Sequence, residues 1–115
     1  MNEQKIIEQI KSKKDIDEIV SQVIKNPKLI DVLISTIDSE KGSIKFGCEK
    51  IIRLVSEKKP GLVYSYFDFL VQLLDSENNF LKWGAIITIS NLASVDSKNQ
   101  FEKILLSIMH LLPVQ

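Results

Sequence analysis

Several residue types on which protein chemistry depends are scarce in this chain of 115 residues. It has one cysteine and one histidine, so it can form no intramolecular disulfide and cannot supply the four ligands of a structural zinc site. A catalytic thiol would need a neighbouring base, and the sequence contains no glycine-rich phosphate loop. The acidic residues are spread along the chain, so no carboxylate pair for acid–base catalysis stands out. We therefore expect no enzyme activity, no cofactor and no metal.

Long apolar runs are also missing. The longest candidate, residues 80–92, contains one lysine and three polar residues, whereas a membrane span needs about 18 apolar residues. Residues 1–14 are polar and charged, without the apolar core of a signal peptide. The net charge is zero, and Arg53 is the single arginine. We expect a cytoplasmic protein that has no association with a membrane.

The apolar residues that are present recur at intervals of three and four, which is the spacing of one face of an α-helix. Residues 16–24 show this pattern; Asp15 is suited to cap the start of that helix and Asn26-Pro27 to end it. Similar stripes predict helices over residues 2–12, 29–37, 44–55, 62–74, 79–94 and 101–112. No strand pattern competes with them. The sequence therefore predicts an all-α protein of about seven helices joined by short connections.

A block of eleven residues at 38–48 returns at 75–85, which is 37 residues later. The proline that precedes each block, Pro27 and then Pro60, returns after 33 residues. The difference of four residues is close to one helical turn, so we expect the first helix of the second unit to be one turn longer. Five positions are identical between the blocks: Asp38/Asp75, Ser39/Ser76, Glu40/Glu77, Lys45/Lys82 and Gly47/Gly84. The two glycines lie inside predicted helices, where we expect them to permit the close approach of a neighbouring helix.

These features together resemble the HEAT/armadillo class of helical repeats. The matching features are a proline early in the first helix, an aspartate at the turn, and an apolar-Lys-x-x-small pattern that opens the second helix at residues 44–48 and 81–85. The resemblance covers roughly residues 27–112. It implies antiparallel helical hairpins stacked as a short right-handed α-solenoid. It also implies a polar ladder that links Asp38 or Asp75 with Lys45 or Lys82.

We expect one domain over residues 1–115. Residues 1–26 would form N-terminal capping helices, residues 27–58 the first repeat and residues 59–96 the second. Residues 97–115 would form a partial repeat or a capping helix. The predicted helix at 101–112, near whose end His110 lies, has no second helix to cover it, so self-association through this C-terminal helix is a further hypothesis.

Some single residues allow specific expectations. Cys48 takes the place of Ala85 in the second unit, so we expect a small core residue. Trp83 parallels Phe46, which favours packing between repeats over a role in binding, and its helix is apolar on most sides, as central helices are. Tyr64 and Phe69 lie off the apolar stripe of their helix and are candidates for a contact surface. The lysine-rich run at residues 11–14 is typical of a solvated helix end.

Proteins of the HEAT/armadillo class mostly act as scaffolds, and their partners bind along the face built by the second helices. We therefore predict a non-enzymatic scaffold for protein–protein interaction, with a protein partner of unknown identity. The alternative is a nucleic-acid-binding module similar to the HEAT-like DNA glycosylases of alkylation repair, which the zero net charge and single arginine disfavour. The predicted contact residues are Lys45, Glu49 and Arg53 in the first unit, and Lys82, Ile86 and Ser90 in the second.

Overall fold

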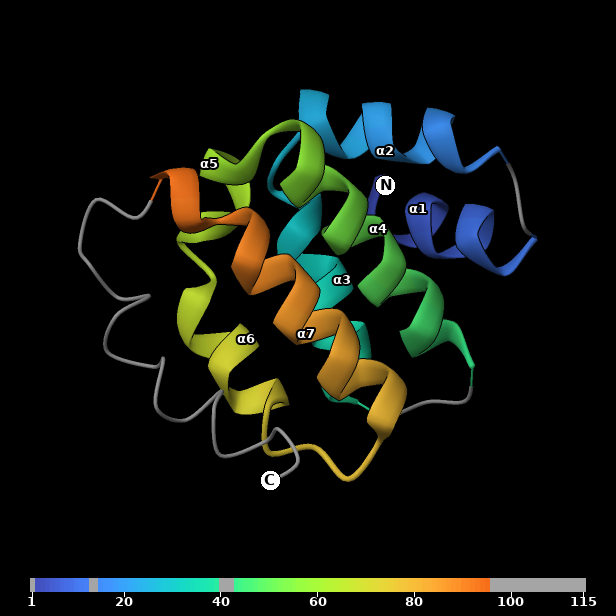
Figure 1. Ribbon diagram of the computed structural model, residues 1–115. Helices are drawn as coiled ribbons and strands as arrows, with labels where there is room; N and C mark the ends of the chain where they lie inside the picture. Colours follow the sequence, from blue (N-terminus) through green and yellow to red (C-terminus); the bar gives the residue numbers. More distant parts are fainter. Residues whose placement is uncertain (1, 13–14, 40–42, 96–115) are drawn as a thin grey trace, which may run out of the picture.

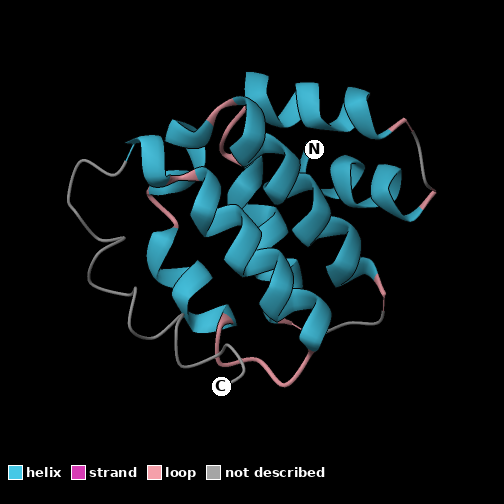
Figure 2. Cartoon of the chain, in the orientation of Figure 1, coloured by secondary structure: helices cyan, strands magenta, loops and turns pink. Residues whose placement is uncertain are grey.

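The computed structural model describes residues 2–12, 15–39 and 43–95, and this part of the chain is all-α, without a β-strand (Figures 1 and 2). The fold class predicted from the sequence is confirmed for these residues. The predicted helix at 101–112 and His110 lie outside the described residues. The elements are α1 (Asn2–Lys11), α2 (Ile16–Lys25), α3 (Leu29–Asp38), α4 (Ile44–Lys58), α5 (Pro60–Tyr64), α6 (Phe67–Leu73), α7 (Asn79–Asn91) and a short 3₁₀-helix, η1 (Ala93–Val95).

The ends of several helices follow the chemistry expected from the sequence. The Asp15 side chain accepts a hydrogen bond of 3.0 Å from the backbone N–H of Asp17 at the start of α2. Helix α2 ends at Lys25, with Asn26 as its C-cap just before Pro27, and Pro60 occupies the first turn of α5. At the start of α7, the Asn78 side chain accepts a bond of 3.1 Å from the Leu81 N–H. Local sequence therefore determines where these helices begin and end.

The predicted helix at 62–74 is instead two helices, α5 and α6, separated by a turn at Ser65 and Tyr66. The Tyr66 N–H bonds to the Val63 carbonyl at 2.9 Å, and its phenol donates a 2.7 Å hydrogen bond to Asp31 on α3. Burial and this bond to a carboxylate raise the pKa of Tyr66 to about 12, so the phenol remains a donor. The second unit therefore has two short helices joined by a two-residue turn, and the expectation of one longer helix was wrong.

Helix α4 is the central element, because it contacts α1, α2, α3, α5 and α7 (Figure 1). The expectation that helix 79–94 is central was wrong: α7 packs on α4 and α6 with one side, and its other side is exposed. The fully buried core combines residues from most helices, among them Ile6, Val23, Ile30, Leu33, Cys48, Ile51, Val55, Val63, Ile89 and Leu92. The other helices are therefore arranged around α4.

The packing of α4 against α7 is what the second helices of adjacent repeats would show. The first helices, α3 and α6, are linked by the bond between Asp31 and Tyr66, and a cavity lies between Ile37 of α3 and Phe69 of α6. The stacking of complete hairpins into a right-handed solenoid is not established by these contacts and stays a prediction.

The two repeated glycines do permit close approach, as predicted. A Cβ atom placed at Gly47 would lie 2.6 Å from Cγ2 of Ile10 on α1. A Cβ at Gly84 would overlap the Glu49 carboxylate, which α4 directs against α7. A glycine inside a helix destabilises that helix by about 1 kcal/mol relative to alanine. At these two positions the glycine also leaves room for the side chain of a neighbouring helix.

We expect Gly47→Ala to lower the free energy of unfolding by about 1 kcal/mol, since a branched side chain of α1 must move to admit the new methyl group. Gly61→Ala is the matched control, because Gly61 is also helical but has no atom within 4 Å of its added Cβ. The control should gain up to about 1 kcal/mol from helix propensity. Urea denaturation measures both variants, and an equal gain in both would contradict the close contact between α1 and α4.

Candidate functional site

Large apolar side chains are exposed along one side of α7. Phe80 is 79% exposed, Trp83 54% and Ile87 40%. Their spacing of three and four residues places them on one side of the helix, while the opposite side buries Leu81 and Ala85. Monomeric soluble proteins seldom expose apolar groups in contiguous patches, and such patches mark interaction sites. This stripe is therefore the strongest candidate for a binding surface.

The stripe continues onto α4. The rings of Phe46 and Phe80 meet edge to face, with centroids 5.9 Å apart and planes at 65°. The Lys45 ammonium lies 5.6 Å from the Phe46 ring centroid, within the range of a cation–π interaction. We call the surface formed by Phe46, Lys50, Phe80, Trp83 and Ile87 the outer face. Trp83 is thus exposed on this face, and the expectation that it packs between repeats was wrong.

The predicted contact residues have different positions in the structure. Ser90 is exposed, whereas Lys45 and Lys82 are half-buried. Ile86 is half-buried and packs against the core. Glu49 is buried, with 8% of its surface exposed, so the expectation that it is an exposed contact residue was wrong. The spacing argument did not single out Phe80 and Ile87, which are exposed on α7. Their exposure depends on which side of an apolar helix the rest of the chain covers.

Glu49 belongs to a polar seam between α4 and α7. Its carboxylate lies over Gly84, and its Oε2 atom is 3.2 Å from Nε of Arg53, one helical turn along α4. The two groups form an ion pair without the alignment of a hydrogen bond. Burial raises the pKa of the Glu49 carboxyl, and the nearby Arg53 guanidinium offsets part of that rise. Arg53, which we predicted as a contact residue, is thus engaged within the protein.

Farther along the seam, hydroxyl, amide and carbonyl groups form hydrogen bonds. Asn91 donates a 3.0 Å hydrogen bond to the Ser56 hydroxyl, which itself donates to the Arg53 carbonyl at 2.6 Å. The buried Thr88 hydroxyl donates to the Gly84 carbonyl at 2.8 Å. The bond between Asn91 and Ser56 joins α4 to α7 at the end away from the aromatic rings, whereas the other two bonds lie within α4 and within α7.

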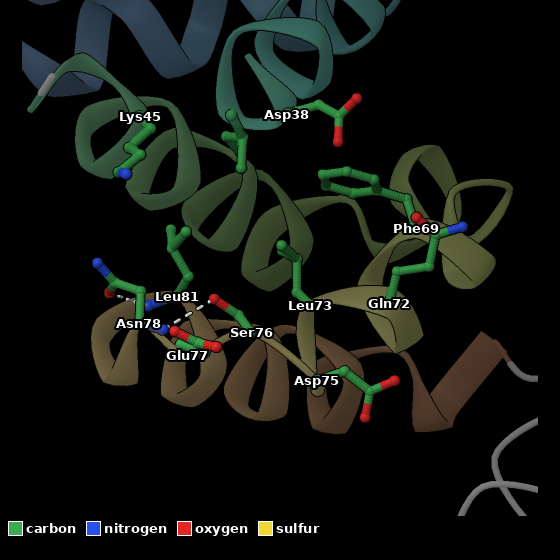
Figure 3. Close-up of a pocket in the computed structure, with 11 residues that line it drawn as sticks. Asp38, Lys45, Phe69, Gln72, Leu73, Asp75, Ser76, Glu77, Asn78 and Leu81 are labelled. Atoms are coloured by element: carbon green, nitrogen blue, oxygen red, sulfur yellow. Dashed lines mark hydrogen bonds between the residues drawn. The ribbon is translucent and has the colours of Figure 1, made fainter. Parts of the chain in front are cut away.

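A cavity of about 620 Å³ lies where the two repeated blocks meet (Figure 3). Its polar lining includes three carboxylates, Asp38, Asp75 and Glu77, and a single lysine, Lys45. We call it the acidic cavity. Ile37, Phe69, Leu73 and Leu81 supply its apolar lining, so Phe69 lies at a cavity edge, while Tyr64 packs edge to face on Phe67.

The polar ladder implied by the resemblance is not formed by ion pairs. Asp38, Asp75 and Lys45 line the same cavity, yet in the described part of the chain the one ion pair within 4 Å joins Arg53 and Glu49. The turn is instead held by Ser76 and Asn78: the Ser76 hydroxyl accepts a 3.0 Å bond from the Asn78 N–H. The repeated aspartates therefore face solvent at the cavity rim.

A second cavity, of about 500 Å³, lies between α1, α2 and α4. Its charged lining residues are Lys11 and Lys50, and no carboxylate lines it among the described residues. We call it the basic cavity. Phe46 belongs to its lining and also to the outer face, so the two surfaces are continuous. The remaining lining is mostly isoleucine, from Ile10, Ile16, Ile19, Ile44 and Ile51.

The cysteine and the metal-ligating side chains are the remaining reactive groups of the described residues. Cys48 is fully buried, which confirms its prediction as a core residue, and burial raises the pKa of its thiol to about 11. No group of three or more metal-ligating side chains is found within residues 2–12, 15–39 and 43–95. None of the described helices is both long and apolar enough to cross a membrane.

Comparison with known proteins adds one relative. The chain is 39% identical over 59 residues to "Uncharacterized protein MJ0078" of Methanocaldococcus jannaschii. The match covers 51% of this chain and 28% of the relative, so the chain spans little more than a quarter of that protein. No family model matches the sequence, and no solved structure matches it.

The raised pKa of Glu49 predicts a pH dependence of stability. Because the native state disfavours the charged carboxylate, stability is full at low pH and declines as pH rises above about 4.5, the ordinary value for this carboxyl. We expect Glu49→Gln to be more stable than the natural chain at pH 7, with the difference vanishing near pH 4.

Urea denaturation between pH 4 and pH 8 measures this difference. Glu57→Gln is the matched control, because Glu57 lies on the same helix and is exposed, so its stability should follow the natural chain at every pH. A Glu49→Gln variant that is less stable at pH 7 than at pH 4, relative to the natural chain, would show that the ion pair with Arg53 outweighs the cost of burial.

Proposed function

We propose that this chain is a module for protein–protein interaction, of HEAT-like architecture and cytoplasmic, whose partner binds across the outer face of α4 and α7. The observation that carries the proposal is the exposed stripe of Phe80, Trp83 and Ile87. Aromatic residues, above all tryptophan, are enriched at the centres of protein interfaces, where they supply most of the binding energy.

The rigidity of the support favours the same function. The outer face lies on two helices that are packed together and joined by the hydrogen bond between Asn91 and Ser56. Since the backbone of both helices is fixed before a partner binds, little backbone entropy would be lost on binding. The apolar groups of this face have no catalytic or metal-binding chemistry, so recognition is the activity that they support.

We expect the double substitution Phe80→Ser/Trp83→Ser to abolish partner binding while leaving the fold intact, because both side chains are exposed and contribute little to the core. The measurement is quantitative affinity capture from the native cell, compared between the natural chain and the variant. Helical circular dichroism and the urea midpoint should change little.

The control is Asp17→Ser/Lys25→Ser, which alters two exposed residues of α2 and keeps the net charge at zero. It should capture the same partners as the natural chain. Identical capture by the Phe80/Trp83 variant and the natural chain would remove the outer face from consideration. Nuclease-sensitive capture of nucleic acid in place of protein would favour the alternative function.

A further inference from the structure

We propose that the partner segment is an amphipathic helix with acidic flanks, which lies along the outer face and inserts an apolar side chain into the basic cavity. The inference rests on the proposed function and identifies the chemistry of the partner. Two observations support it. An apolar surface continues from α7 onto α4, and the charged side chains that line the cavity beside it are lysines.

The apolar surface extends from α7 to the basic cavity through one residue. Phe46 contacts Phe80 edge to face, and on its other side it lines the cavity with Ile10 and Ile44. A partner that covers Trp83 and Phe80 therefore meets, next to Phe46, an open cavity of about 500 Å³ whose lining is mostly isoleucine. Such a cavity suits a large aliphatic or aromatic side chain, because most of its lining is apolar.

The charged residues that line the basic cavity are lysines, Lys11 and Lys50, and Lys82 is the only charged residue of α7. The carboxylates near α4 and α7 lie elsewhere. Glu49 is paired with Arg53, and Glu57 is two helical turns beyond Lys50. The acidic cavity holds the other three, Asp38, Asp75 and Glu77. Complementary charge around an apolar centre favours partners with glutamate or aspartate at the edges of their apolar stripe.

A helical partner fits the geometry better than an extended one. Strand addition needs an exposed sheet edge, and the described residues contain no strand. The exposed side chains of α7 at positions 80, 83 and 87 form a ridge at helical spacing, which packs into the grooves of a second helix. The 13 residues of α7 span about 20 Å, so a partner of about 18 residues would cover both the ridge and the cavity.

Single-stranded nucleic acid also binds to aromatic side chains beside lysines. Two observations favour a peptide. The cavity beside Phe46 is lined by branched aliphatic residues, which offer no flat surface to a base, and the only arginine is held by Glu49. Binding of nucleic acid, or of basic peptides in place of acidic ones, is therefore a result that the test must distinguish.

The test is a phage-displayed library of 18-residue amphipathic helices in which apolar and flanking positions are randomised, selected on the full chain. Phe80→Ser/Trp83→Ser serves as the counter-selection target. We expect the enriched peptides to carry Asp or Glu beside their apolar stripe. Synthetic copies of these peptides should shift the fluorescence of Trp83, the only tryptophan, to shorter wavelength as it becomes buried.

For those peptides we expect Lys11→Glu/Lys50→Glu to weaken binding roughly tenfold, and peptides with Lys in place of the acidic residues to recover it. The matched control is Lys25→Glu/Lys58→Glu, which makes the same change in net charge at the far ends of α2 and α4 and should have a much smaller effect. An equal loss in both variants would mean that net charge alone matters and would overturn the proposal.

Three other results would also overturn it: enrichment of neutral or basic peptides, no enriched helix at all, or binding of a dT oligonucleotide that peptides cannot displace. The two proposals can fail separately. If cellular capture depends on Phe80 and Trp83 but selection yields no acidic helices, the interaction function stands and the partner chemistry is wrong. If capture is indifferent to those residues, the proposed function itself fails.

Discussion

The burial of helix α4 is the constraint on which the rest of this structure depends. Cys48, Ile51, Ile52 and Val55 occupy one side of it, and five other helices contact it. The hydrophobic free energy of folding therefore requires α4 to be covered from several directions at once. The strip of α4 that stays accessible is narrow, and Phe46 and Lys50 lie on it. A single central helix thus determines both where the core is and where a partner can reach the molecule.

Close packing around α4 depends on two glycines, Gly47 and Gly84, and the second of them is faced by a carboxylate. Gly84 leaves space that a carboxylate fills, and the raised pKa of Glu49 shows that its charged form is less well stabilised there than in water. A group that reduces stability can still define structure, as buried polar residues do when they fix the register of paired helices. Glu49 fits against α7 only where a glycine faces it, so it favours one alignment of α4 with α7. That alignment brings Phe46 beside Phe80.

Periodicity predicted most of the helices, because each buries one side of its own length and each start or end is determined by nearby residues. Periodicity failed where a structural feature depends on a residue that is distant in the sequence. The turn at Ser65 and Tyr66 contains neither glycine nor proline, and it is tied to Asp31, 35 residues earlier. Glu49 looked exposed by its position on α4, since nothing local indicates that Gly84 will face it. The outer face was missed in part because a helix that is apolar on most sides carries no information about which side its neighbours will cover.

The chain has zero net charge, which disfavours nucleic acid as its ligand, but its charged side chains are unevenly distributed over the surface. Among the described residues, the cavity beside Phe46 is lined by two lysines without a carboxylate, whereas the cavity at the repeated turns has three carboxylates and one lysine. Net charge describes solubility and long-range attraction, but recognition depends on the local field within about 10 Å, the screening length at physiological salt. At that range the two cavities present opposite signs to a partner.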